Sequence, residues 1–223
     1  MRRPKVDYSG FRRPRIREPE YRHLLLLLGW PVYFAMYFLT ENLIPAENCT
    51  PVHIWLDDII PFCEWFVIPY VFWYFLIIIS LGYFLRYNVD GFRRLQIFLI
   101  ITQTVAMAIY ILFPNRQDLR PAEFPRDNFL TRCIGVLYRL DTNTGVCPSL
   151  HVAYSVGMAS AWLKEKEVSK LWKGFVAVAV ILICLSTMFI KQHSAVDFMV
   201  AIPVCLLAEG IAYGDRWLLR RRI

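Results

Sequence analysis

The run IIPFCEWFVIPYVFWYFLIIISLGYFL, residues 59–85, decides the fold class of this chain. It exceeds the roughly 18–20 apolar residues that a helix needs to cross a hydrocarbon core about 30 Å thick. Its one acidic residue is Glu64, close to its beginning. A run of this length and composition predicts a transmembrane helix.

Other apolar runs predict further membrane spans, which brings the total to six. Five of these six runs are clearly long and apolar enough, and one is weaker. We therefore expect an all-α integral membrane bundle of six transmembrane helices. The predicted spans cover residues 23–44, 59–85, 95–113, 146–163, 172–190 and 194–213. The composition agrees, because 57% of the residues are hydrophobic and the mean hydropathy is +0.41. A soluble domain of this length needs far less apolar surface, so a bilayer is the expected solvent.

Positive charge marks the expected cytoplasmic ends of the spans. Residues 1–22 hold eight lysines and arginines with three prolines and predict a basic cytosolic tail, residues 23–215 form the membrane domain, and residues 216–223 form a second basic cytosolic end. Lysines and arginines also follow the second and fourth spans. Both termini are then cytoplasmic, and the net charge of +7 indicates membrane anchoring, with no nucleic-acid partner.

One segment predicted to lie outside is unexpectedly basic. Residues 114–145 include Arg116 and Arg120 among five arginines. An outer loop of this charge favours an anionic ligand. The alternative is local pairing with the acidic residues of the same loop.

A histidine stands near the predicted outer end of the fourth span, in the segment Gly-Val-Cys-Pro-Ser-Leu-His, residues 145–151. Pro148 suits a first helical turn, so the amides of Ser149 and Leu150 are expected to be free donors for an anion. His151 would stand one turn further in, where it can protonate a leaving oxygen. A histidine at a helix end is more often structural, so this segment alone is a weak signal.

A second histidine stands at the same predicted face, in the segment Lys-Gln-His-Ser-Ala-Val-Asp, residues 191–197. Asp197 follows His193 by four residues, which predicts that both side chains share a helix face. The carboxylate would fix the imidazole tautomer and support its positive charge. Such a histidine can attack phosphorus and form a covalent phosphohistidine. The two histidines therefore predict one active site at the outer face.

Smaller signals carry less weight. Glu64 is either a residue that supports the site or the partner of a structural hydrogen bond. Asp57 and its neighbours His53 and Asp58 predict a polar, solvated outer loop. Cys133 and Cys147 could form a disulfide. Asn48-Cys49-Thr50 fits a glycosylation sequon.

The order of these motifs resembles the type 2 phosphatidic acid phosphatase superfamily over roughly residues 110–215. The resemblance rests on Arg120-Pro121, on Pro-Ser-Leu-His at residues 148–151 and on the His193–Asp197 spacing. It implies that Arg120 and Ser149 bind phosphate, that His151 is the acid, and that His193 is the nucleophile oriented by Asp197. It also implies a six-helix membrane core and a mechanism that needs no metal or other cofactor.

The chain departs from the family pattern at two positions. Phe113 stands where the first motif normally opens with a lysine or arginine, and Arg116 is the nearest basic replacement. Thr187 stands where the third motif normally has its arginine; Lys191 could supply that charge or could instead extend to water. Ser186-Thr187 in the third motif, together with the acidic and aromatic second span, is similar to the inositol phosphorylceramide synthase and sphingomyelin synthase branch of the superfamily.

The sequence thus favours an enzyme, either a phosphoric ester hydrolase or a phosphotransferase. The leading interpretation is a lipid phosphatase that hydrolyses a lipid phosphate or diphosphate through a phosphohistidine. The alternative within the same chemistry moves a phospho-headgroup to a lipid or inositol hydroxyl. A third interpretation is a non-catalytic lipid-binding protein or a transporter, although a transporter would be expected to have inverted repeats or broken helices, which this sequence lacks.

Overall fold

The computed structural model describes residues 4 and 6–220, with side chains as far as residue 214, and over this part of the chain it is almost entirely helical. The α-helices are α1 Gly29–Leu43, α2 Trp55–Ile59, α3 Val67–Tyr87, α4 Val89–Leu112, α5 Phe129–Leu140, α6 Leu150–Lys164, α7 Lys170–Phe189 and α8 Ala195–Arg220. Short 3-10 segments cover Arg13–Arg17, Arg22–Leu28, Ala46–Asn48 and Glu64–Phe66. Two short parallel strands, β1 Thr50–Pro51 and β2 Asn115–Arg116, pair with each other.

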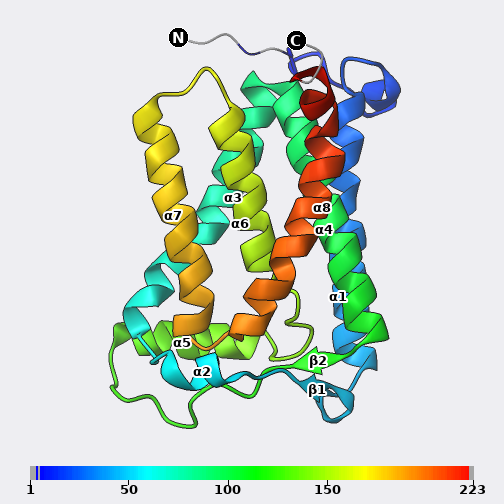
Figure 1. Ribbon diagram of the computed structural model, residues 1–223. Helices are drawn as coiled ribbons and strands as arrows, with labels where there is room; N and C mark the ends of the chain where they lie inside the picture. The colour runs from blue at the N-terminus through cyan, green and yellow to red at the C-terminus, as the bar shows by residue number, and fades with distance from the viewer. Residues whose placement is uncertain (1–3, 5, 221–223) are drawn as a thin grey trace.

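The six long helices α1, α3, α4, α6, α7 and α8 stand side by side, whereas α2, α5 and both strands gather at one end of the bundle (Figure 1). Helix α1 begins and α8 finishes at the opposite end. Helix α6 lies centrally and packs against α4, α7 and α8. The end that carries α2, α5 and the strands is called the capped end below.

Five helical segments are long and apolar enough to cross a membrane: Arg22–Leu43, Glu64–Tyr87, Val89–Leu112, Lys170–Phe189 and Ala195–Gly214. They coincide with five of the six predicted spans, and these apolar helices indicate a multi-pass membrane protein. Many of their large apolar side chains are exposed, including Phe38, Ile78 and Leu206 at 64%, 69% and 68%. Apolar surface of that extent suits a lipid environment.

The span predicted over residues 146–163 is shorter than expected. Helix α6 has 15 residues, which gives about 22 Å at 1.5 Å per residue, below the thickness of a hydrocarbon core. The start is delayed because the side-chain oxygen of Asn115 accepts the amides of Val146 and Cys147 and holds them outside the helix. Pro148 also lies before the helix and not in its first turn, since Ser149 is the N-cap.

The core of the bundle lies where α4 meets α6. Phe92, Leu95 and Phe98 on α4 are fully buried. Gly157 on α6 allows this close approach, because a Cβ there would lie 2.6 Å from Cδ1 of Phe98. The two helices are therefore fixed in position relative to each other, and α6 carries one of the two candidate histidines.

The segment before α1 is not wholly solvated. Tyr21 is buried, and the hydroxyl of Tyr8 donates to the carbonyl of Leu85 at the end of α3. All six cysteines are free, so the disulfide considered between Cys133 and Cys147 does not form in this structure.

Candidate functional site

His193 lies in the tight turn between α7 and α8. The carbonyl of Thr187 accepts the amides of both Gln192 and His193, at 2.9 and 3.0 Å, and so closes the turn. Nδ1 of His193 lies 3.1 Å from Oδ2 of Asp197, and the Asp197 side chain is fully buried. With Nδ1 engaged by the carboxylate, Nε2 is the ring nitrogen with a free lone pair.

The predicted His193–Asp197 contact is present, but its cause differs from the predicted one. His193 precedes α8, so the two residues do not share a helix face. Asp197 instead occupies the third position of α8, and its Oδ2 also accepts the amide of Ser194 at 2.9 Å. This is the reciprocal arrangement in which an acidic side chain near the start of a helix satisfies the amide of the N-cap residue. The same oxygen therefore caps α8 and orients the histidine.

His151 is the second residue of α6 and faces the same turn. Its ring centroid lies 5.6 Å from that of His193, 4.6 Å from Tyr70 and 4.2 Å from Trp73. Its Nε2 is buried and has no hydrogen-bond partner in the structure. A buried imidazole nitrogen without a partner is costly unless a ligand or water completes it. The prediction that the two histidines meet is confirmed by this geometry.

A cavity of about 430 Å³ adjoins both rings. Its polar end is formed by His151, His193, Gln192, Asp141 and Thr142. Its apolar end lies between α1 and α3 and includes the side chains of Trp30, Tyr33, Phe34, Ile77 and Ile78. Phe34 and Ile78 are exposed, at 57% and 69%, so the apolar end reaches the outer surface of the bundle. The cavity therefore joins the histidines to a surface made of apolar side chains.

The amide of Ser149 is not the free donor that the sequence predicted. It donates to the backbone carbonyl of Asp197 at 3.1 Å. The Ser149 hydroxyl, which is fully buried, caps α6 by accepting the amide of Val152. The amides of Leu150 and His151 lie in the first turn of α6, where backbone N–H groups have no carbonyl acceptor within the helix. An anion at this helix end would meet those two amides.

Arg120 contacts Gln192, the residue before His193, and is held by backbone carbonyls. Its Nη1 donates to Tyr138, its Nη2 donates to Asp141 and Thr142, and the same Nη2 lies 2.7 Å from Oε1 of Gln192. Its Nε is buried without a partner. Burial lowers the pKa of Arg120, and the nearby carboxylate of Asp141 opposes that effect. Arg120 is thus fixed against Gln192, which directly precedes His193.

Asp141 lines the cavity. From the sequence it was expected only to be one of the acidic residues that pair with arginines within the basic loop of residues 114–145. Its Oδ1 accepts the hydroxyl of Tyr37, and its Oδ2 accepts the side-chain amide of Gln192 at 3.2 Å and the hydroxyl of Tyr70 at 3.4 Å. Burial raises its pKa, and the charges of His193 and Arg120 oppose that rise. Its position after α5 gave no periodic signal that could have identified it.

Two other predicted site residues point elsewhere. Arg116 binds Asp118 and the carbonyls of the loop before β1. Lys191, which has a positive φ of 55°, directs its Nζ to the carbonyls of Asp57 and Ile60. Burial lowers the pKa of Lys191, and the carboxylates of α2 oppose that effect. Neither residue lines the cavity, and their role in binding phosphate stays a prediction.

Glu64 makes structural hydrogen bonds, which was one of the two roles expected for it from the sequence. Its Oε1 lies 3.0 Å from Nη1 of Arg126 and 3.3 Å from Nδ2 of Asn128. These bonds join the start of α3 to the loop before α5. Glu64 does not line the cavity, and a supporting role for it in catalysis stays a prediction.

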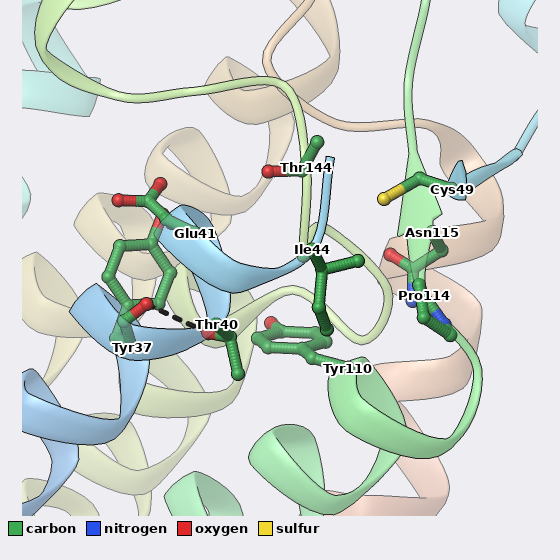
Figure 2. Close-up of a pocket in the computed structure, with 10 residues that line it drawn as sticks. Tyr37, Thr40, Glu41, Ile44, Cys49, Tyr110, Pro114, Asn115 and Thr144 are labelled. Atoms are coloured by element: carbon green, nitrogen blue, oxygen red, sulfur yellow. Dashed lines mark hydrogen bonds between the residues drawn. The ribbon is translucent and has the colours of Figure 1, made fainter. Parts of the chain in front are cut away.

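A small pocket of about 20 Å³ lies next to the large cavity at the capped end. Figure 2 shows Tyr37 and Glu41 of α1 and Tyr110 of α4 around it, with Asn115 from β2 and Thr144 from the loop before α6. Tyr37, Tyr110 and Thr144 also line the large cavity, so they form a shared wall. A space of this size holds about one water molecule.

Phe113 and Thr187, the two departures from the family pattern, differ in environment. Phe113 is 72% exposed, whereas Thr187 is fully buried and donates its hydroxyl to the carbonyl of Cys184. Among the described residues, no group of three or more histidine, cysteine or acidic side chains has the arrangement of a metal site. Comparison with protein-family models, curated proteins and solved structures finds no match for this chain.

Proposed function

We propose that the chain is a membrane lipid phosphatase that hydrolyses a lipid phosphate or diphosphate through a phosphohistidine intermediate. The observation that carries this proposal is the pair of histidine rings 5.6 Å apart, one held by Asp197, at the polar end of a cavity whose other end is apolar. Such a cavity suits a ligand with a polar head and an apolar tail. In this proposal α6 is the sixth transmembrane helix, both termini are cytoplasmic, and the capped end is the outer face.

The proposed reaction has two steps. Nε2 of His193 attacks phosphorus, the bond from phosphorus to the leaving oxygen breaks, and His151 gives that oxygen a proton. Asp197 accepts the hydrogen bond from Nδ1 and stabilises the positive ring. In the second step neutral His151 takes a proton from water, the oxygen attacks phosphorus, and the bond from phosphorus to nitrogen breaks.

Phosphotransfer is the second candidate function, because the two reactions differ only in the acceptor. The large cavity supports it, since its aromatic and apolar walls can take the hydroxyl end of a lipid as well as water. The acceptor would be a lipid or inositol hydroxyl, as in the synthase branch that the motifs resemble. A binding protein or transporter without catalysis is the remaining alternative.

The test is to incubate purified protein with lipid phosphates and diphosphates, with and without diacylglycerol, inositol or ceramide. Free phosphate would support hydrolysis, and a new phospholipid would support transfer. His193→Ala should abolish both, whereas His53→Ala, which changes an exposed residue bound to Asp58, should leave both unchanged. Full activity of folded His193→Ala would contradict the mechanism.

A further inference from the structure

A buried carboxylate from a distant segment holds the turn that carries His193. Asp57 on α2 was expected to be solvated, but it is 3% exposed. Its Oδ1 accepts the amide of Ala195 at 2.8 Å, and its Oδ2 accepts the hydroxyl of Ser194 at 2.6 Å. Both contacts cross more than 130 residues of sequence. Asp57 therefore fixes the two residues that directly follow His193.

The contacts of Asp57 complete the N-terminus of α8. The amide of Ala195 goes to Asp57, the amide of Val196 goes to the Ser194 hydroxyl, and the amide of Asp197 goes to the Ser194 carbonyl. A helix N-terminus attracts anions because its amides are unpaired and its dipole is positive there. Here the protein supplies the anion itself, so this helix end is not a phosphate site.

Three more bonds attach the same turn to the segment around α2. Lys191 donates through Nζ to the carbonyls of Asp57 and Ile60, and the amide of Cys63 donates to the carbonyl of Phe189. The left-handed backbone of Lys191 is costly for a residue with a Cβ, and these bonds offset that cost. The turn is thus held from α2 on both sides of His193.

We infer that Asp57 is a positioning residue for the proposed nucleophile, holding His193 through Ser194 and Ala195. The inference rests on the proposed function, in which Nε2 of His193 must lie in line with the bond that breaks. A displacement of a reacting group by about 1 Å can lower a rate about 100-fold. Asp57 does not line the cavity and reaches the reaction only through Ser194 and Ala195, so its loss should lower kcat and leave KM nearly unchanged.

Other titratable or charged groups also surround His193 and must stay constant in the test. Asp197 comes from α8, Asp141 from the loop after α5, and His151 from α6. Lys191 belongs to the turn itself, and Arg120 reaches it through Gln192. A substitution at Asp57 removes one of the two α2 carboxylates that oppose the lowered pKa of Lys191, and Asp58→Asn removes the other, so the control variant shares this effect.

The experiment compares Asp57→Asn with Asp58→Asn in the full-length protein. Asp58 is the next residue on α2, but its side chain is 68% exposed and binds His53. We expect Asp57→Asn to lower kcat at least 10-fold with KM within threefold, and Asp58→Asn to match the wild type. Ser194→Ala removes one of the two bonds to Asp57, together with the cap on the amide of Val196, and keeps the bond from Ala195. It should give an intermediate loss of kcat.

Binding of orthovanadate, followed by vanadium NMR, gives a readout that does not need turnover, because vanadate forms a five-coordinate adduct with a well-placed imidazole. Asp57→Asn should weaken this adduct at least 10-fold relative to Asp58→Asn. Equal kcat and equal vanadate binding in the two variants, or a loss explained by a smaller folded fraction alone, would overturn the inference. Retained turnover in His193→Ala would instead overturn the proposed function.

Discussion

Replacing Asp197 by asparagine tests the link between the carboxylate and His193. The variant keeps an oxygen that can accept from Nδ1 of His193 and from the amide of Ser194, but it loses the negative charge. A hydrogen bond to a charged group contributes about 1.5–3 kcal/mol. Each 1.36 kcal/mol is about tenfold in rate, so kcat should fall roughly 10- to 150-fold. Asp197→Ala should lose more, because it also frees the ring to rotate and leaves the amide of Ser194 without its partner.

The assay is release of phosphate from a lipid phosphate by purified protein in detergent micelles. Asp127→Asn is the matched control, since Asp127 belongs to a loop at the same capped end and its side chain is 78% exposed in a pair with Arg132. The control should keep the wild-type rate. A kcat for Asp197→Asn within twofold of the wild type, with the protein folded, would refute the view that the charge stabilises the ring in the reaction.

Three further predictions concern other parts of the structure. Lys191→Met should lower the midpoint temperature of thermal unfolding, because it removes two hydrogen bonds to backbone carbonyls, each of which contributes roughly 1–3 kcal/mol. KM for the lipid phosphate should stay within twofold of the wild-type value. Asp141→Asn should unfold at a higher temperature at neutral pH. Burial raises the pKa of Asp141 above 3.8. The ionised Asp141 side chain therefore destabilises the fold as the pH rises through the raised pKa, and this effect is absent at low pH. The melting temperature should vary less between pH 4 and 8 in the variant than in the wild type. Ile78→Trp should narrow the apolar end of the cavity. Losing about 50 Å² of apolar contact costs about 1.3 kcal/mol, so KM for a long-chain lipid phosphate should rise roughly tenfold, with Ile79→Trp, outside the cavity lining, as the control.

The elements predicted well from sequence are those whose signal is local. Five helices long and apolar enough to cross a membrane follow from apolar runs. The contact between His193 and Asp197 was also predicted, although the capping of α8 produces it and not a shared helix face. The start of α6 was predicted too early because it depends on Asn115, which lies 31 and 32 residues before the two amides that it holds. No periodic pattern encodes such a contact.

The buried carboxylates could not be placed from sequence for the same reason. Asp57 reads as part of a polar loop, yet its partners Ser194 and Ala195 lie at the far end of the chain. Asp141 reads as one acid in a basic loop, but its partners come from α1, α3 and the turn before α8. A charged residue in a loop is solvated unless distant donors reach it, and only the fold shows whether they do.

The way in which α8 is capped restricts where the phosphate group of the proposed substrate can bind. Asp57 and Ser194 satisfy the first amides of α8, and the amide of Ser149 is used by the Asp197 carbonyl. Two groups of donors are candidates. One is the first amides of α6, and the other is the guanidinium of Arg120, which does not line the cavity and already bonds three carbonyls and Gln192. The first group is directed by a helix dipole toward the cavity. The second contacts Gln192, the residue before His193. It would have to exchange a carbonyl partner for a phosphoryl oxygen, and this exchange is favourable because hydrogen bonds from a guanidinium to a charged oxygen are stronger than those to a neutral carbonyl. We therefore expect the phosphate to lie between the start of α6 and the turn of His193, with the lipid tail directed between α1 and α3.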